Sequence, residues 1–265
     1  MSRQIGLIKV KGNLDGVSFY QSNGENFVRM AKGPDKNRIM NDPAFKRTRE
    51  NNREFSGSAI AAKACREALM PALKVADHRL TSRTLKLIRS VHSKSKGVRG
   101  ERPIEISLNK GLLENFEFNE TIKFTSIFKH KPEIEAAPDR ISGKLSIPEF
   151  SLSEGFKPPK DATHLRFMYA MGTISDFAFD KATTKFNPVA PKLNGLYAVS
   201  YSEYFDINTI ENVSVTLEAS LANNPVLTDK VSVMHGVGIM FYKQEDDDAL
   251  YPLKQGNAFK IVSVV

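Results

Sequence analysis

The strongest constraint on this chain's fold is a helical segment, Asn37 to Val91, with strand and turn patterns on both sides. It opens with the residues NRIMNDPAFKRTRENNREF. Asn41 or Asp42 can cap a helix there. Pro43 suits the first helical position, because the N–H that proline lacks would be unpaired in any case. A helical segment between two strand-rich regions indicates an α+β fold.

Within this segment the apolar spacing predicts three basic helices, from Pro43 to Phe55, from Ala59 to Leu69, and from Pro71 to about Val91. The sequence Ser-Gly-Ser at 56–58 indicates a kink or a break between the first two. A polar linker is expected before them, at Lys32 to Asn41. After the helices, residues 92–102 form a basic loop. It is either a solvated linker or a loop that contacts phosphates and releases their counterions.

Residues 5–30 have the pattern of two or three short strands joined by glycine turns, the first strand at Ile5 to Val10. Asn23-Gly24 lies between two apolar runs and predicts a hairpin, because both central residues of a type I′ turn take positive φ. An arm of about 25 residues buries little apolar surface alone, so it must dock on its own body or on another subunit. We expect its contacts to come from Ile5, Leu7, Val17, Phe19, Phe27 and Val28.

From Pro103 onward, short apolar runs alternate with turns. Lys144 to Ile147 and Val213 to Leu217 each place one residue type on each face. Ile104 to Leu108 and Thr121 to Phe128 are also expected strands. Strands of this length and spacing predict an antiparallel β-sandwich. The complete prediction is a β-hairpin arm at 1–36, two or three basic helices at 37–102 and a β-sandwich domain at 103–265.

The net charge of +8 is unevenly distributed along the 265 residues. Residues 1–102 carry 22 Lys and Arg against 9 Asp and Glu, a net charge of +13. Residues 103–265 carry 16 against 21, a net charge of −5. This difference suggests two regions with different roles. The basic half could face nucleic acid, an acidic partner, or the acidic half of a neighbouring copy.

Composition limits the class of protein. The 41% hydrophobic and 26% charged fractions are those of an ordinary globular protein. No apolar run approaches the ~18 residues of a membrane span, and the N-terminus has no secretory pattern. The one cysteine, Cys65, lies in an apolar run and is expected to be a buried thiol. These features predict a cytoplasmic protein.

Catalytic and metal-binding motifs were not found. The sequence has no phosphate-binding glycine loop, no nucleophile elbow and no zinc spacing among its five histidines. His164 is expected to be a strand residue with a hydrogen-bonding role. The acidic run Glu245 to Asp248 is expected to be a solvated turn, since it lacks the spaced ligands of a calcium loop. Single carboxylates among arginines are expected to form ion pairs: Asp42, Glu50, Glu54 and Asp77. We therefore expect no enzyme, metal or cofactor.

Two groups of cations are candidates for binding nucleic acid or a protein partner. Lys46, Arg49 and Arg53 share one face of the first predicted helix, being three and four residues apart. Nearby glutamates interrupt this face, and no nucleic-acid-binding consensus is present. The basic loop supplies the second group, which is Lys94, Lys96 and Arg99.

The chain resembles a family of uncharacterised proteins from Bacteroidota. The resemblance is close to full length and is densest over residues 5–91. It is carried by Ile5-Gly-Leu-Ile-Lys-Val-Lys-Gly12, Phe19-Tyr20, Val28-Arg29, Asn41-Asp-Pro-Ala-Phe45, Arg47-Thr-Arg-Glu-Asn51, Glu54-Phe55, Phe116-Glu-Phe-Asn119, Ala162-Thr-His164 and Leu250-Tyr-Pro-Leu253. Ser56 stands where the family pattern has glycine. The resemblance implies a glycine-rich β arm, a basic helical segment and a β-rich body, and it implies no activity.

The leading functional expectation is a non-enzymatic structural or assembly protein that contacts copies of itself through its arm and basic helical segment. Contact between the basic end of one copy and the acidic end of the next would give rings or filaments, as in phage-like particles. One alternative is a nucleic-acid-binding protein that uses the basic half. Another is an enzyme of unknown type, which would need a cleft with converging titratable groups.

Overall fold

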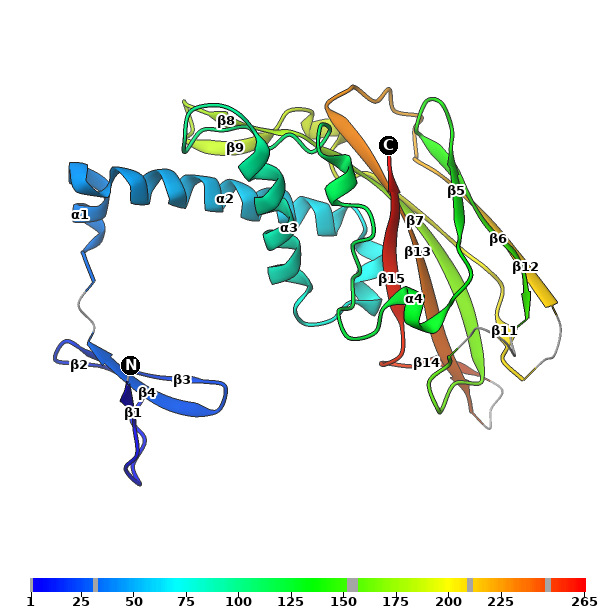
Figure 1. The fold of residues 1–265 in the computed structure, drawn as a ribbon, viewed down its shortest axis with the longest axis horizontal. Coiled ribbons are helices and arrows are strands. Elements are labelled where there is room, and N and C mark those ends of the chain that lie inside the picture. The colour runs from blue at the N-terminus through cyan, green and yellow to red at the C-terminus, as the bar shows by residue number, and fades with distance from the viewer. Residues whose placement is uncertain (1, 31–32, 152–156, 209–211, 246–248) are drawn as a thin grey trace. The chain divides into compact units, whose positions relative to one another are not determined.

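The computed structural model describes residues 2–30, 33–151, 157–208, 212–245 and 249–265 (Figure 1). The chain divides into two compact units, Met1–Glu50 and Asn51–Val265. The predicted α+β class is confirmed, since strand hairpins come first, helices follow, and the remainder is mostly antiparallel strand. The predicted boundaries at 36/37 and 102/103 differ from this division, because most of the helical segment packs on the following sheet and belongs to the second unit.

The first unit contains a four-stranded antiparallel sheet, which we call the arm sheet. Its strands, in spatial order, are β1 (Ser2–Arg3), β4 (Glu25–Met30), β3 (Val17–Ser22) and β2 (Gly12–Leu14). The predicted hairpin turn is present, with φ of 51° at Asn23 and 80° at Gly24. The strand predicted at Ile5 to Val10 is wrong. That segment is a loop, because the amide of Gln4 accepts from Val10 N (2.9 Å) and donates to Val10 O (3.1 Å), which closes it.

The helical segment differs in detail from the prediction. Its elements are α1 (Lys36–Asn41), the 3₁₀ turn η1 (Pro43–Phe45), α2 (Lys46–Glu67), the 3₁₀ turn η2 (Met70–Val75) and α3 (Leu80–Lys94). Asp35 caps α1 inside the expected linker, and Asp42 caps η1. The break expected at residues 56–58 is wrong. The helix α2 continues through Gly57, because the missing side chain lets the ring of Phe186 pack against the helix backbone.

The third predicted helix also begins later than expected. After η2, the carboxylate of Asp77 accepts from Arg79 N (2.8 Å) and from Glu120 N (2.7 Å). These bonds hold the chain in a turn, and α3 starts at Leu80 rather than at Pro71.

The second unit contains two antiparallel sheets and several short elements. The main sheet has the order β10 (Tyr197–Tyr201), β7 (His164–Ser175), β13 (Val231–Gln244) and β14 (Leu250–Pro252), with β11 (Phe205–Asp206) on β7 and β15 (Ala258–Val264) on β13. The second sheet has the order β12 (Asn212–Ser220), β6 (Ser142–Ser151) and β5 (Glu133–Ala136). The remaining elements are the hairpin β8 (Phe177–Asp180) and β9 (Lys185–Pro188), the short helix α4 (Phe124–Ile127), and the 3₁₀ turns η3 (Lys110–Leu112) and η4 (Pro191–Leu193).

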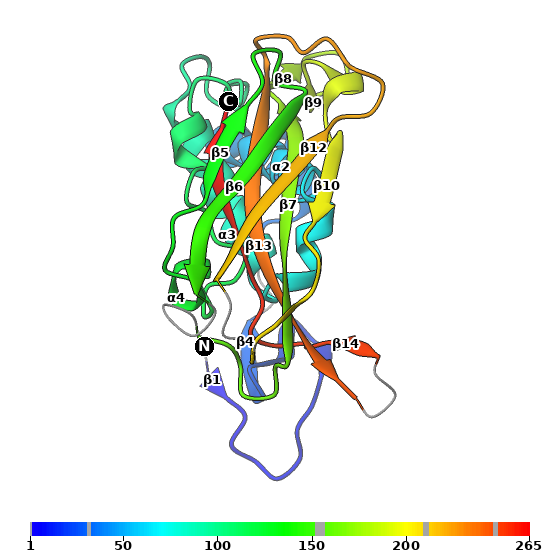
Figure 2. The same cartoon turned by 90° about the vertical axis from the view of Figure 1, so that its right-hand side faces the viewer.

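The unit has three layers (Figures 1 and 2). The helices α2 and α3 cover one face of the main sheet, and the second sheet covers the other. Alternate residues of β7 serve the two cores: Met168 and Ala170 face the helices, whereas Phe167 and Tyr169 face the second sheet. A strand covered on both faces has no polar side, which explains the long apolar run of β7.

The strand predicted at Thr121 to Phe128 is wrong, since the structure has the helix α4 there. Side chains redirect the backbone at this point. The Asn119 side chain accepts from Thr121 N (3.1 Å) and from Ile122 N (3.0 Å), and Glu117 accepts from Phe124 N (3.0 Å). Ile104 to Leu108, also expected as a strand, contributes a single bridge from Ile104 to Phe177.

The acidic run at 245–248 lies mostly outside the described residues. Of the helices in the described ranges, none combines the length and the apolar character needed to cross a membrane.

Candidate functional site

The arm sheet has one apolar face. Residues directly opposite each other on paired strands project to the same side of a sheet. Val17 lies opposite both Leu14 and Met30, and Phe19 lies opposite Val28. These five side chains therefore share one side of three adjacent strands, and we call this surface the apolar arm face.

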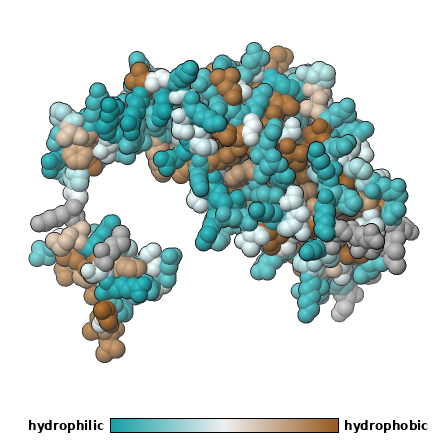
Figure 3. Space-filling model, viewed as in Figure 1, coloured by the Kyte–Doolittle hydropathy of each residue, from teal (hydrophilic) through white to brown (hydrophobic). Residues whose placement is uncertain are grey.

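The apolar arm face has no core of its own to cover it. Of the described residues 2–30, none is buried. Leu14 and Met30 remain 66% and 63% exposed, and the loop before β2 exposes Leu7 completely and Ile5 to 92%. Figure 3 shows hydrophobic residues gathered on the surface of the arm. A surface of this kind is typical of a protein contact site.

The opposite face of the arm sheet is polar and aromatic. Tyr20 stacks on Phe27 with ring centroids 5.7 Å apart, and the guanidinium of Arg29 lies 5.3 Å from the centre of the Tyr20 ring. Arg3 pairs with Glu25 at 2.8 Å. Of the six residues predicted for arm contacts, the structure places Val17, Phe19 and Val28 on the apolar arm face. Phe27 lies on the opposite face, and Ile5 and Leu7 lie in the loop.

The second unit contains a polar cavity of about 440 Å³ between α2, α3 and the loop 95–102, which we call the helical cavity. Its lining residues are Asn51, Asn52, Glu54, Phe55, Ser58, Arg89, His92, Ser93, Arg99 and Arg102.

The carboxylate of Glu54 organises this cavity. It accepts from Arg102 Nε (2.8 Å), from Arg102 Nη2 (2.6 Å) and from Gly100 N (2.8 Å). This arrangement is a bidentate ion pair with an added backbone donor, and it fixes the loop onto α2. The hydrogen bonds from Arg102 are the main reason why the pKa of Glu54 falls from 4.5 to about 2.

His92 is a buried residue that lines the helical cavity. Its Nε2 lies 2.9 Å from Arg102 O, and its Nδ1 lies 2.9 Å from Ser58 Oγ. Burial lowers the pKa of His92, so the ring is neutral near pH 7. The neutral ring donates from Nε2 to the carbonyl of Arg102. The Ser58 hydroxyl, which lies beside Nδ1, donates to Glu54 O at 2.8 Å. The contacts of His92 with Ser58 and Arg102 join α2, α3 and the loop.

The candidate cations of the first group have structural roles of their own. Arg49 donates to Ile39 O (2.7 Å) and to Asp42 O (2.9 Å), which closes the corner between α1 and η1. Arg53 lies 3.7 Å from Glu101 and stacks over Phe179. Lys46 is exposed.

Of the second group, the structure brings Arg99 to the helical cavity, where it donates to Asn51 Oδ1 (2.9 Å). Lys94 and Lys96 are exposed and are not among the lining residues. Sequence reasoning missed Arg89 and His92 as lining residues. The sequence prediction ended the third helix at about Val91 and placed His92 in the loop, whereas α3 continues to Lys94 and brings both residues to one helix.

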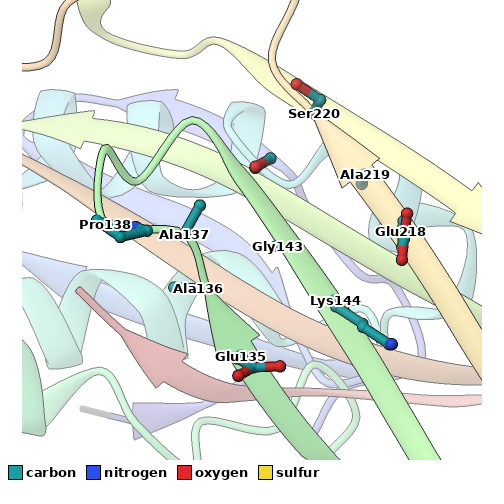
Figure 4. A pocket seen from close by; sticks show the side chains of 10 residues that line it. Glu135, Ala136, Ala137, Pro138, Gly143, Lys144, Glu218, Ala219 and Ser220 are labelled. Carbon is teal, nitrogen blue, oxygen red and sulfur yellow. The ribbon is translucent and has the colours of Figure 1, made fainter.

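A second cavity of about 540 Å³ lies over the second sheet. Figure 4 shows Glu135, Lys144 and Glu218 on three neighbouring strands. Lys144 is paired in register with both glutamates. The other lining residues are small or aliphatic. This row of alternating charges on an outer sheet face stabilises strand pairing, and we assign it no binding role.

Cys65, His164 and the single carboxylates lie as the sequence predicts. Cys65 is buried, its sulfur lies 3.7 Å from Met234 Sδ, and burial raises the pKa of its thiol to about 12. His164 lies in β7, with Nδ1 3.0 Å from Thr163 Oγ1. The other single carboxylates form ion pairs with Arg38, Arg47 and Arg83. Within the described ranges, no group of three histidine, cysteine or acidic residues is placed to hold a metal ion.

A scan of protein-family models, a search of curated proteins and a search of solved structures each found no match to this chain.

Proposed function

We propose that this chain is a non-enzymatic structural protein of the cytosol that assembles with copies of itself through its arm. The observation that carries this proposal is the apolar arm face, on which Leu14, Val17, Phe19, Val28 and Met30 lie together on a sheet without buried residues.

The energetics of the arm support an external contact. Full burial of one such side chain contributes about 1.5–3 kcal/mol. Ordering the backbone costs about 1–2 kcal/mol per residue. Half-buried side chains on one small sheet offset little of this cost. Covering the apolar arm face with a second copy would bury these side chains further and offset more of it.

The chemistry of the face favours a protein contact over nucleic acid. Phosphate binding needs lysine and arginine at the contact, and the apolar arm face has neither. Lys46, Lys94 and Lys96 are exposed and could contact phosphates. Nucleic-acid binding is therefore one of the outcomes that the test below distinguishes.

Single-residue variants on the two faces of β3 test the proposal. Phe19→Asp places a charge on the apolar arm face. Ser18→Asp places the same charge on the opposite face, where its register partner is Arg29. By light scattering after size-exclusion chromatography, we expect the wild type and Ser18→Asp to share one oligomeric mass and Phe19→Asp to have the monomer mass.

A salt series on nuclease-treated protein distinguishes self-assembly from nucleic-acid binding. An assembly held by apolar contacts keeps its mass at moderate salt, whereas phosphate contacts weaken steeply. A wild type that is monomeric at all concentrations, or that loses its mass on nuclease treatment, contradicts the proposal.

A further inference from the structure

We propose that the helical cavity binds a small organic oxyanion, a molecule with a phosphate or carboxylate group attached to an apolar body. This site is independent of the arm, so the two proposals fail or stand separately.

The charge of the lining residues favours an anion over a cation. Glu54 is the one carboxylate among the described residues that line the cavity. Its oxygens already accept three hydrogen bonds from Arg102 and Gly100. These bonds take three of the roughly four acceptor positions of the carboxylate, and the guanidinium of Arg102 balances its charge, so Glu54 is a poor ligand for a metal or an ammonium group.

Hydrogen-bond donors reach the cavity from three elements. Arg89 comes from α3, Asn52 from α2, and Arg102 from the loop. Arg102 bonds to Glu54 through Nε and Nη2. Among the described residues, its Nη1 makes one long bond of 3.4 Å, to Ser93 O. Guanidinium groups bind phosphate and carboxylate oxygens through paired donors.

Phe55 supplies an apolar wall beside these donors. Its side chain is 50% exposed, and the guanidinium carbon of Arg89 lies 5.8 Å from the ring centre. This contact orients Arg89 without using its N–H groups. The cavity, at about 440 Å³, is within the usual range for small-molecule sites and has room for an organic body next to the anion.

Isothermal titration calorimetry with four probes tests the site: phenyl phosphate, benzoate, inorganic phosphate and phenol. We expect phenyl phosphate to bind more tightly than inorganic phosphate, since it adds a contact with Phe55, and we expect phenol not to bind. Comparison of phenyl phosphate with benzoate distinguishes a phosphate ligand from a carboxylate ligand.

Matched variants on α3 distinguish binding in the helical cavity from general attraction of anions by positive charge. Arg89→Ala is expected to weaken phenyl phosphate binding about tenfold. Lys86→Ala removes the same charge one turn away, outside the lining residues, and is expected to bind as the wild type does. Phe55→Ala is expected to weaken phenyl phosphate by a larger factor than inorganic phosphate, because it removes the contact with the organic body as well as the ring that orients Arg89.

Three outcomes overturn the proposal: no heat from either aromatic anion at millimolar concentration, equal binding of phenol and phenyl phosphate, or equal losses in Arg89→Ala and Lys86→Ala. Melting temperatures of the variants show that each is folded, and both α3 positions are exposed, so the substitutions leave the core intact.

Discussion

A buried polar pair, Tyr169 and His235, lies inside the otherwise apolar core between the two sheets. The Tyr169 hydroxyl lies within hydrogen-bond distance of His235 Nδ1, at 2.8 Å. Burial lowers the pKa of His235 to about 4 and raises the pKa of Tyr169 well above its ordinary value, so both groups are neutral near pH 7. Gly143 of the second sheet faces this pair, and a Cβ on that residue would overlap the tyrosine hydroxyl.

The first prediction concerns this contact. Gly143→Ala is expected to reduce the free energy of unfolding by about 1–3 kcal/mol, because the new methyl group overpacks the core. In a Tyr169→Phe background the same change should cost less, since the overlapping oxygen is gone. Urea denaturation of the four proteins in the cycle measures the coupling, and additive losses would contradict this account.

The second prediction follows from the lowered pKa of Glu54, about 2 against an ordinary 4.5. As pH falls, the unfolded chain takes up this proton first. The stabilisation is therefore complete above about pH 4.5 and is lost as pH falls towards 2. At pH 7, Glu54→Gln is expected to reduce the free energy of unfolding by about 1–3 kcal/mol.

Urea denaturation of the wild type and Glu54→Gln between pH 3 and 7 measures how the difference in their free energies of unfolding changes with pH. The difference between them should be constant near neutral pH and should shrink below about pH 4.5. If this difference in unfolding free energy grows as the pH falls, the assignment of Glu54 as a charged, paired group is wrong.

At the scale of elements, the central contact is that of α2 with the main sheet. The chain at the end of α2 approaches β7 so closely that a Cβ on Gly172 would overlap the carbonyl of Ala68. Ala61, Ala64 and Ala68 are buried. Small residues on the helix and a glycine on the strand together permit this short distance between backbones.

The third prediction tests that contact. Gly172→Ala is expected to cost about 3 kcal/mol of unfolding free energy, near the top of the overpacking range, because the opposing atom belongs to the backbone and cannot rotate away. Gly111→Ala is the control, since nothing lies within 4 Å of its Cβ position. Thermal unfolding compares the two, and equal melting temperatures would contradict the proposed packing.

At the scale of the whole molecule, the two units differ in how much apolar core each contains. Asn51–Val265 contains two apolar cores, one on each side of the main sheet. The arm sheet in Met1–Glu50 contains no buried residue among those described. The second unit therefore has the cores that a stable domain needs, whereas the arm sheet has none of its own.

The fourth prediction is the effect of deleting residues 1–31. If the arm contacts another subunit, the shortened chain should be a folded monomer with the melting temperature of the full chain. If the arm contacts its own chain, the melting temperature should fall. Calorimetry and light scattering report both quantities, and a deletion that leaves melting temperature and oligomeric mass unchanged would refute both versions.

The sequence by itself determined the features that depend on local chemistry. Asn23-Gly24 specified its hairpin, because few other residues take positive φ at two consecutive positions. Asp42 and Pro43 specified the start of a helical turn. Strand alternation specified β6 and β12 of the second sheet, and the apolar run around Cys65 specified burial.

Only the tertiary structure decided features in which distant residues compete with local preference. Gly57 stays helical because Phe186 packs against it, and Thr121 to Phe128 turns because Glu117 and Asn119 accept its backbone N–H groups. The helical cavity needs Glu54 beside Arg102, 48 residues later in the chain. No local pattern encodes such a distance, since the packing of α2 and α3 on one sheet brings these groups together.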